Sequence, residues 1–156
     1  MNARQLVQRL EANLQAELGA KNREIETLAR QEAAIAARDV EALASASAEL
    51  AEILQRGTER AAARSAILAE LGRALGLPAP VRLGALADAL DERGAVLHAR
   101  RAELRERCAV AMKAGRRVAA LVRMHAGIVD ETLGRFLAPD PSGAPLGCGS
   151  LVDAEA

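Results

Sequence analysis

Residues 76–80 read Gly76-Leu77-Pro78-Ala79-Pro80 and divide the chain into two helical regions. Glycine readily takes the left-handed backbone conformation in which many helices end. Proline lacks the backbone N–H that an α-helix needs and clashes with the preceding turn. We therefore predict that one helix ends at Gly76 and that another begins after Pro80, at about residue 82.

The region before this break carries apolar residues on a seven-residue spacing. Val7, Leu14, Leu28 and Ile35 follow this spacing with Lys21 as the middle member, and the adjoining row holds Leu10, Leu18 and Ile25. Such a narrow apolar stripe is typical of helices that pack as coiled coils. The pattern predicts a helix over residues 3–37.

A second apolar stripe follows Arg38 and runs from Val40 to Leu75. We predict a turn at residues 38–39, with Asp39 as the N-cap of a helix over residues 40–75, because aspartate often caps helices in this way. No glycine or proline enforces this turn. One continuous helix from residue 3 to residue 75 is therefore the alternative.

The region after the break predicts a long last helix over residues 82–137. Its seven-residue row contains Leu83, Leu90, Leu97, Leu104, Ala111, Val118 and His125. Pro139, Pro141 and Gly143 end the pattern, and residues 138–156 are expected to form a flexible tail. The fold class is all-α, an elongated antiparallel helical hairpin or three-helix coiled-coil bundle with one helical domain at residues 1–137. Composition agrees, since Phe136 is the only aromatic residue and strong helix formers dominate.

The end of the last helix is more apolar than a narrow stripe requires. At about 100° per residue its apolar side chains cover an arc of roughly 220°. Three interpretations are open: the helix bends at Gly115 and buries the arc on the first two helices, the chain self-associates, or the arc binds a client protein. The candidate client-binding residues are Val118, Leu121, Val122, Met124, Ile128, Val129, Leu133, Phe136 and Leu137.

Residues with the spacing of a catalytic or metal site are missing from the sequence. The two histidines and two cysteines, His98, His125, Cys108 and Cys148, show no paired spacing of the kind that binds zinc. His125 is interpreted as a packed or partly solvated imidazole on the apolar row, and Cys108 as a small core residue. We therefore predict no catalytic residues, no cofactor and no metal, and a protein that is not an enzyme.

Charge is balanced over the chain, although residues 82–123 hold ten basic and five acidic residues. Arg93, Arg100 and Arg107 form one row, which we interpret as a solvated flank paired with acidic residues of the same or the second helix. Nucleic-acid binding is not expected, because aromatic platforms and an overall basic charge are missing. The sequence holds no signal core and no run of eighteen apolar residues, so we expect a cytoplasmic protein without membrane insertion.

The order of these signals resembles the FlgN-type flagellar export chaperones over nearly the whole chain. Leu18, Glu24, Leu28 and Glu32 resemble the first family helix, Asp39 and Leu43 the start of the second, and Glu59-Arg60, Arg64 and Leu68 its end. The tail phrases Asp140-Pro141-Ser142-Gly143 and Ser150-Leu151-Val152-Asp153-Ala154 are the more specific match. The chain departs from the family at Gly115 and Val118, where asparagines are usual, and at Pro139, where a tyrosine is usual.

The resemblance implies a cytosolic chaperone of flagellar hook-associated proteins, which form the hook–filament junction. Such a chaperone keeps its clients unassembled and delivers them to components of the flagellar type III export apparatus. The apolar end of the last helix would bind the helical termini of the client, and the chaperone would be a monomer or weak homodimer. The alternative is a structural coiled-coil adaptor or oligomerisation module without a transient client.

Overall fold

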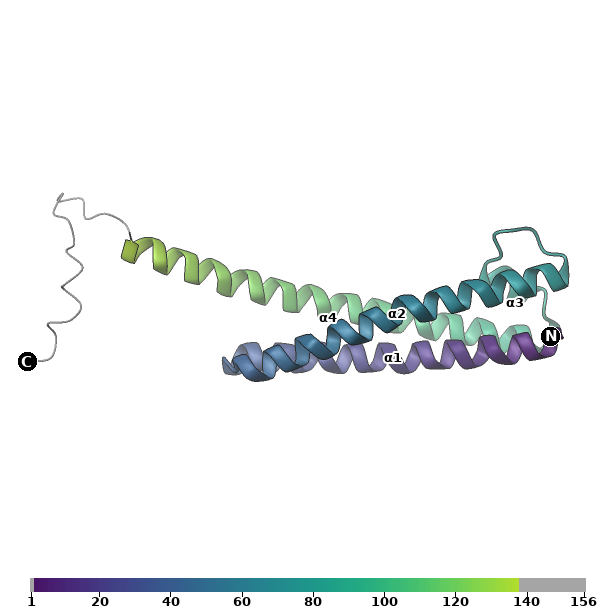
Figure 1. The fold of residues 1–156 in the computed structure, drawn as a ribbon, viewed down its shortest axis with the longest axis horizontal. Helices are drawn as coiled ribbons and strands as arrows, with labels where there is room; N and C mark the ends of the chain where they lie inside the picture. The colour runs from purple at the N-terminus through teal and green to yellow at the C-terminus, as the bar shows by residue number, and fades with distance from the viewer. Residues whose placement is uncertain (1, 138–156) are drawn as a thin grey trace, which may run out of the picture. The chain divides into compact units, whose positions relative to one another are not determined.

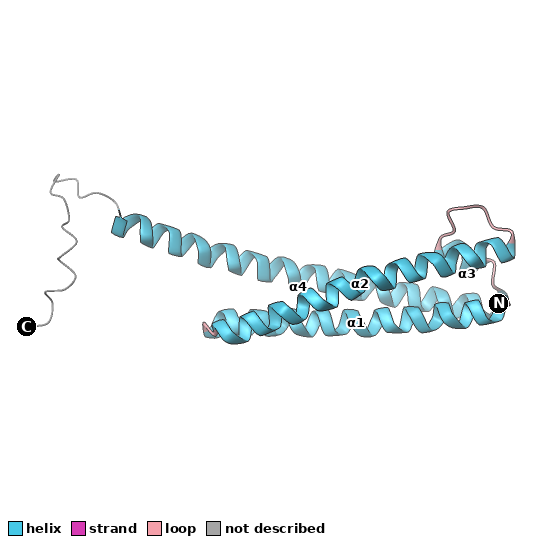
Figure 2. Cartoon of the chain, viewed as in Figure 1, coloured by secondary structure: helices cyan, strands magenta, loops and turns pink. Residues whose placement is uncertain are grey.

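The computed structural model describes residues 2–137, which form four α-helices (Figures 1 and 2). The first two helices, α1 (Ala3–Ala37) and α2 (Val40–Leu75), have the bounds expected from the apolar stripes. A loop then leads to the short helix α3 (Leu83–Asp88) and the long helix α4 (Asp91–Leu137). The all-α class with a long last helix is confirmed. The tail expected at residues 138–156 lies outside the described residues.

The turn between α1 and α2 is present, so the single continuous helix is excluded. Arg38 takes the left-handed conformation, with φ 57°, and ends α1. The Asp39 carboxylate accepts a hydrogen bond of 2.9 Å from the backbone N–H of Ala42, which confirms Asp39 as an N-cap. At the other end of α2, Gly76 is also left-handed, with φ 67°, as its position before the prolines predicted.

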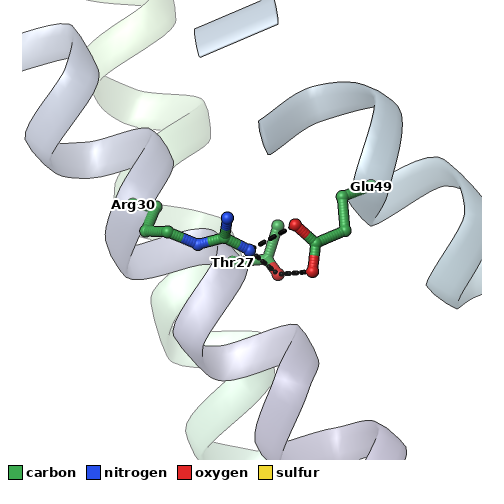
Figure 3. A network of polar contacts seen from close by, with 3 residues as sticks. All are labelled: Thr27, Arg30 and Glu49. Atoms are coloured by element: carbon green, nitrogen blue, oxygen red, sulfur yellow. Dashed lines mark hydrogen bonds and ion pairs between the residues drawn. The ribbon is translucent and has the colours of Figure 1, made fainter. Parts of the chain in front are cut away.

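The helices α1 and α2 pack side by side as an antiparallel hairpin. Their cross-contacts show the direction, because Glu17 reaches Arg64 whereas Thr27, further along α1, reaches Glu49, earlier in α2. Figure 3 shows the second of these contacts, in which Arg30 binds both the Glu49 carboxylate and, at 3.0 Å, the Thr27 hydroxyl. Near the α1–α2 turn, polar contacts therefore join the two helices.

The apolar core lies at the other end of the hairpin, where α3 and the start of α4 join it. Its buried side chains come from all four helices, and Leu75, Leu77, Val81, Leu83, Leu90 and Leu104 pack around them. Fully burying one such side chain is worth about 1.5–3 kcal/mol. This cluster therefore holds the bundle together, and its larger members are Leu6, Leu10, Leu14, Ile67, Leu68, Leu71, Leu86 and Leu97.

The last helix does not run unbroken from residue 82, as the leucine row had predicted. It is divided at Ala89–Leu90 into α3 and α4. The two pieces approach closely at Gly94, where an added Cβ would lie 2.2 Å from the backbone oxygen of Ala87. A glycine at this position permits the approach, and the neighbouring residues Leu86 and Ala87 are buried in the core. The leucine spacing survives the break, which is why the sequence pattern does not reveal it.

The first part of α4 runs parallel to α1. Arg93 lies 3.8 Å from Glu11, and Arg117 lies 3.2 Å from Glu32, so both helices advance in the same direction along the bundle. Acidic residues of α1, and not of the second helix, thus pair with this flank of α4. Arg100 pairs within α4, with Glu103 at 3.2 Å, as expected for a solvated flank.

Residues 1–119 form one compact unit, and a second unit begins at Ala120 and is described as far as Leu137. The first unit contains the bundle and its core. The described part of the second unit is the C-terminal stretch of α4. It contains eight of the nine candidate client-binding residues, since Val118 belongs to the first unit.

Candidate functional site

The C-terminal stretch of α4 presents large apolar side chains to solvent. Phe136 and Leu137 are 76% and 78% exposed, which are unusually high values for such side chains. Five further residues are about half exposed, namely Val122, Met124, Ile128, Val129 and Leu133. Large contiguous apolar patches on the surface of a protein usually mark interaction sites.

Two of the nine predicted residues are less exposed than the other seven. Val118 is only 9% exposed and is buried in the first unit, so it belongs to the bundle and is not available at the surface. Leu121 is half-buried, at the start of the exposed stretch. The helix α4 also continues through Gly115 without a break.

The exposed stretch is amphipathic. Helical geometry, at about 100° per residue, places Leu121, Val122, Ile128, Val129 and Phe136 on one face. Of its charged residues, Arg123 and Asp130 lie on the opposite side of the helix, whereas Glu131 and Arg135 lie at the edge of the apolar residues. Arg135 donates a hydrogen bond of 2.5 Å to Glu131. We call residues 121–137 of α4 the apolar segment, and its broad apolar side the apolar face.

Some exposed apolar residues escaped the sequence-based prediction. Val96, Val110 and Met112, earlier on α4, are between about 40% and 60% exposed. They lie one position away from the seven-residue row that contains Leu97 and Ala111. This displacement from the row is the signal that could have identified them as surface residues.

The polar residues between α1 and α2 have a structural role. Glu17 is buried and binds Arg64, and the Asn13 amide donates a hydrogen bond of 3.3 Å to the backbone oxygen of Arg60. The positions that resembled the end of the second family helix, Arg60 and Arg64, thus hold the hairpin together. These contacts supply no nucleophile and no acid–base pair.

Cys108 is partly exposed and lines a hollow of about 380 Å³ between the helices, together with Leu54 and Leu104. It is therefore less buried than the core position that was predicted. His98 is hydrogen-bonded to Asp88 at 2.9 Å, and Cys148 lies outside the described residues. Over residues 2–137, no three His, Cys, Asp or Glu side chains gather in a way that could bind a metal ion.

A comparison with known protein families identifies the family of this chain. The profile of the FlgN protein family matches residues 1–139, which is most of the chain. Neither a curated protein nor a solved structure matches it. The chain belongs to the FlgN family.

The FlgN family is a family of chaperones of flagellum assembly and not a family of enzymes. The helical fold agrees with that class. The matched region ends at residue 139, so it does not include the tail phrases that begin at Asp140. None of the helices in residues 2–137 has the length and apolar character needed to cross a membrane. The family therefore sets the class of protein.

Proposed function

We propose that this protein is a cytoplasmic chaperone that binds flagellar hook-associated proteins through the apolar face of α4. It keeps these junction proteins unassembled and delivers them to the flagellar type III export apparatus. The single observation that carries the proposal is the exposure of the apolar segment in a member of a flagellar export chaperone family. The contact residues on this segment are Leu121, Val122, Met124, Ile128, Val129, Leu133, Phe136 and Leu137.

The chemistry of the face indicates what kind of client segment it binds. Most of its side chains are aliphatic, and His125 and Thr132 are the polar residues among them, so the face offers few hydrogen-bonding groups. An amphipathic helix could lay its own apolar side on this face and complete a small helical bundle. The terminal helices of a junction protein would meet this requirement and would be shielded from assembly while bound.

The test is calorimetric titration of the full chain with a purified hook-associated protein. A double variant, Ile128→Ser with Leu133→Ser, removes two half-exposed side chains from the apolar face. Each buried aliphatic side chain is worth about 1.5–3 kcal/mol, so the affinity should fall by at least tenfold. The matched control is Val96→Ser with Met112→Ser, which alters two similarly exposed positions in the first unit.

The control variant should bind as the unmodified chain does, and both variants should retain their helicity. An equal loss of affinity in the two double variants would count against a localised client site. Sedimentation of the free chain tests the adaptor alternative, because an adaptor should already bury this face in a stable oligomer. We expect a monomer or a weakly associating homodimer.

A further inference from the structure

His125 lies in the middle of the apolar face. The four residues nearest to it on a helix, three and four positions away in each direction, are Leu121, Val122, Ile128 and Val129. All four are apolar, and the imidazole itself is exposed. A partner that covers these four side chains must therefore cover His125 as well.

Thr132, a second polar residue on this side of the helix, differs from His125 in one respect. Its hydroxyl donates a hydrogen bond of 2.7 Å to the backbone oxygen of Ile128, so its donor is already satisfied. Among the described residues, His125 has no hydrogen bond and no ion pair. When a client covers the apolar face, the imidazole of His125 therefore loses its contact with water and has no hydrogen-bonding group of the described residues to replace it.

We propose that His125 makes client binding depend on pH, with the client held by the neutral imidazole and weakened when the imidazole is protonated. Burial in apolar surroundings penalises the charged form of a histidine much more than the neutral form. An ordinary imidazole is half protonated near pH 6.5. Acidification through that range therefore opposes the covered state. This inference rests on the proposed function and adds regulation by pH to the same surface.

No charge on the helix compensates the imidazolium. Arg123 and Asp130 lie on the opposite side of the helix, and Glu131 is tied to Arg135 by an ion pair. Over residues 107–129 the sequence contains four arginines and one lysine but no acidic residue. Along this stretch of α4 no carboxylate is therefore present to pair with the imidazolium when a client covers the apolar face.

The test is calorimetric titration of the full chain with a purified hook-associated protein at pH 7.5 and pH 5.5. If the complex holds only the neutral imidazole, the affinity should be about tenfold weaker at pH 5.5. His125→Gln keeps a polar side chain but cannot titrate. Between pH 7.5 and pH 5.5, the affinity of this variant should therefore fall about tenfold less than the affinity of the unmodified chain. His98→Gln is the matched control, because His98 is the only other histidine, and it should retain the full dependence.

Proton release gives a second readout that does not depend on stability at low pH. Binding at pH 6.5, measured in buffers of different ionisation enthalpy, should release about half a proton more from the unmodified chain than from His125→Gln. Equal proton release, or an affinity that rises on acidification through His125, would overturn the inference and leave the proposed function standing. Failure of the unmodified chain to bind at pH 7.5 would remove both.

Discussion

Arg64 of α2 donates a hydrogen bond to the Glu17 carboxylate of α1, and this ion pair lies within the hairpin, with the Glu17 side chain only 11% exposed. Within residues 2–137, the second carboxylate oxygen of Glu17 has no hydrogen-bond partner. The pair joins α1 to α2 at a place where the carboxylate has little contact with solvent. The main energetic effect of losing one residue of the pair is therefore the cost of leaving the other charge buried and unpaired.

Replacing Arg64 with Met should destabilise the protein by about 2 kcal/mol, because a mostly buried carboxylate would lose its cation. The double replacement Glu17→Leu with Arg64→Leu should recover most of this loss, since burying two apolar groups is often as favourable as burying an ion pair. Urea unfolding measures both. Arg56→Met is the control, because the Arg56–Glu52 pair is exposed and should contribute less than about 1 kcal/mol. A double variant less stable than Arg64→Met would contradict this account.

Gly94→Ala should destabilise the bundle by about 1–3 kcal/mol, as overpacking usually does. The added methyl group would lie 2.2 Å from the backbone oxygen of Ala87, which cannot move without displacing α3. Gly19→Ala is the control, because nothing lies within 4 Å of its added Cβ. That change should stabilise α1 by up to about 1 kcal/mol through helix propensity alone. Thermal unfolding distinguishes them, and a stabilised Gly94→Ala variant would disprove the close approach.

Arg38→Gly should stabilise the protein by about 1 kcal/mol. Arg38 is left-handed, a conformation that costs a residue with a Cβ roughly 1–2 kcal/mol and costs glycine almost nothing. The greater freedom of glycine in the unfolded chain offsets part of the gain. Arg38→Ala should leave the free energy of unfolding nearly unchanged, because alanine retains the penalty. Chemical denaturation of the two variants checks this, and equal stabilities would argue against the left-handed turn.

Phe136→Ala should weaken binding of a hook-associated protein by roughly tenfold or more, because a large, fully covered side chain contributes a couple of kcal/mol. The same change should barely alter helicity or the melting temperature, since Phe136 is 76% exposed. Val40→Ala is a control of equal exposure on α2 and should leave the affinity unchanged. A Phe136→Ala variant that unfolds, while its folded fraction binds normally, would assign Phe136 to the core.

The sequence by itself determined the helical class and most helix ends of this protein. Apolar spacing and local capping act within a few residues, so Asp39 and Gly76 could be assigned from their neighbours alone. The wide apolar side of residues 121–137 was visible for the same reason, because helical geometry fixes which side chains share a face. The tail phrases of the sequence lie beyond the described residues and add nothing to the structural comparison.

Tertiary structure decided what depends on contacts between distant residues. The division of the last helix at Ala89–Leu90 rests on the approach of Ala87 to Gly94, and the leucine spacing is the same with or without it. Val118 continues the apolar row of the exposed segment, yet it is buried because it lies within the first unit. The turn at Arg38 has no glycine to enforce it, so packing of α2 against α1 must offset its left-handed backbone. Burial of this kind is a property of the whole fold, and a local pattern of residues cannot specify it.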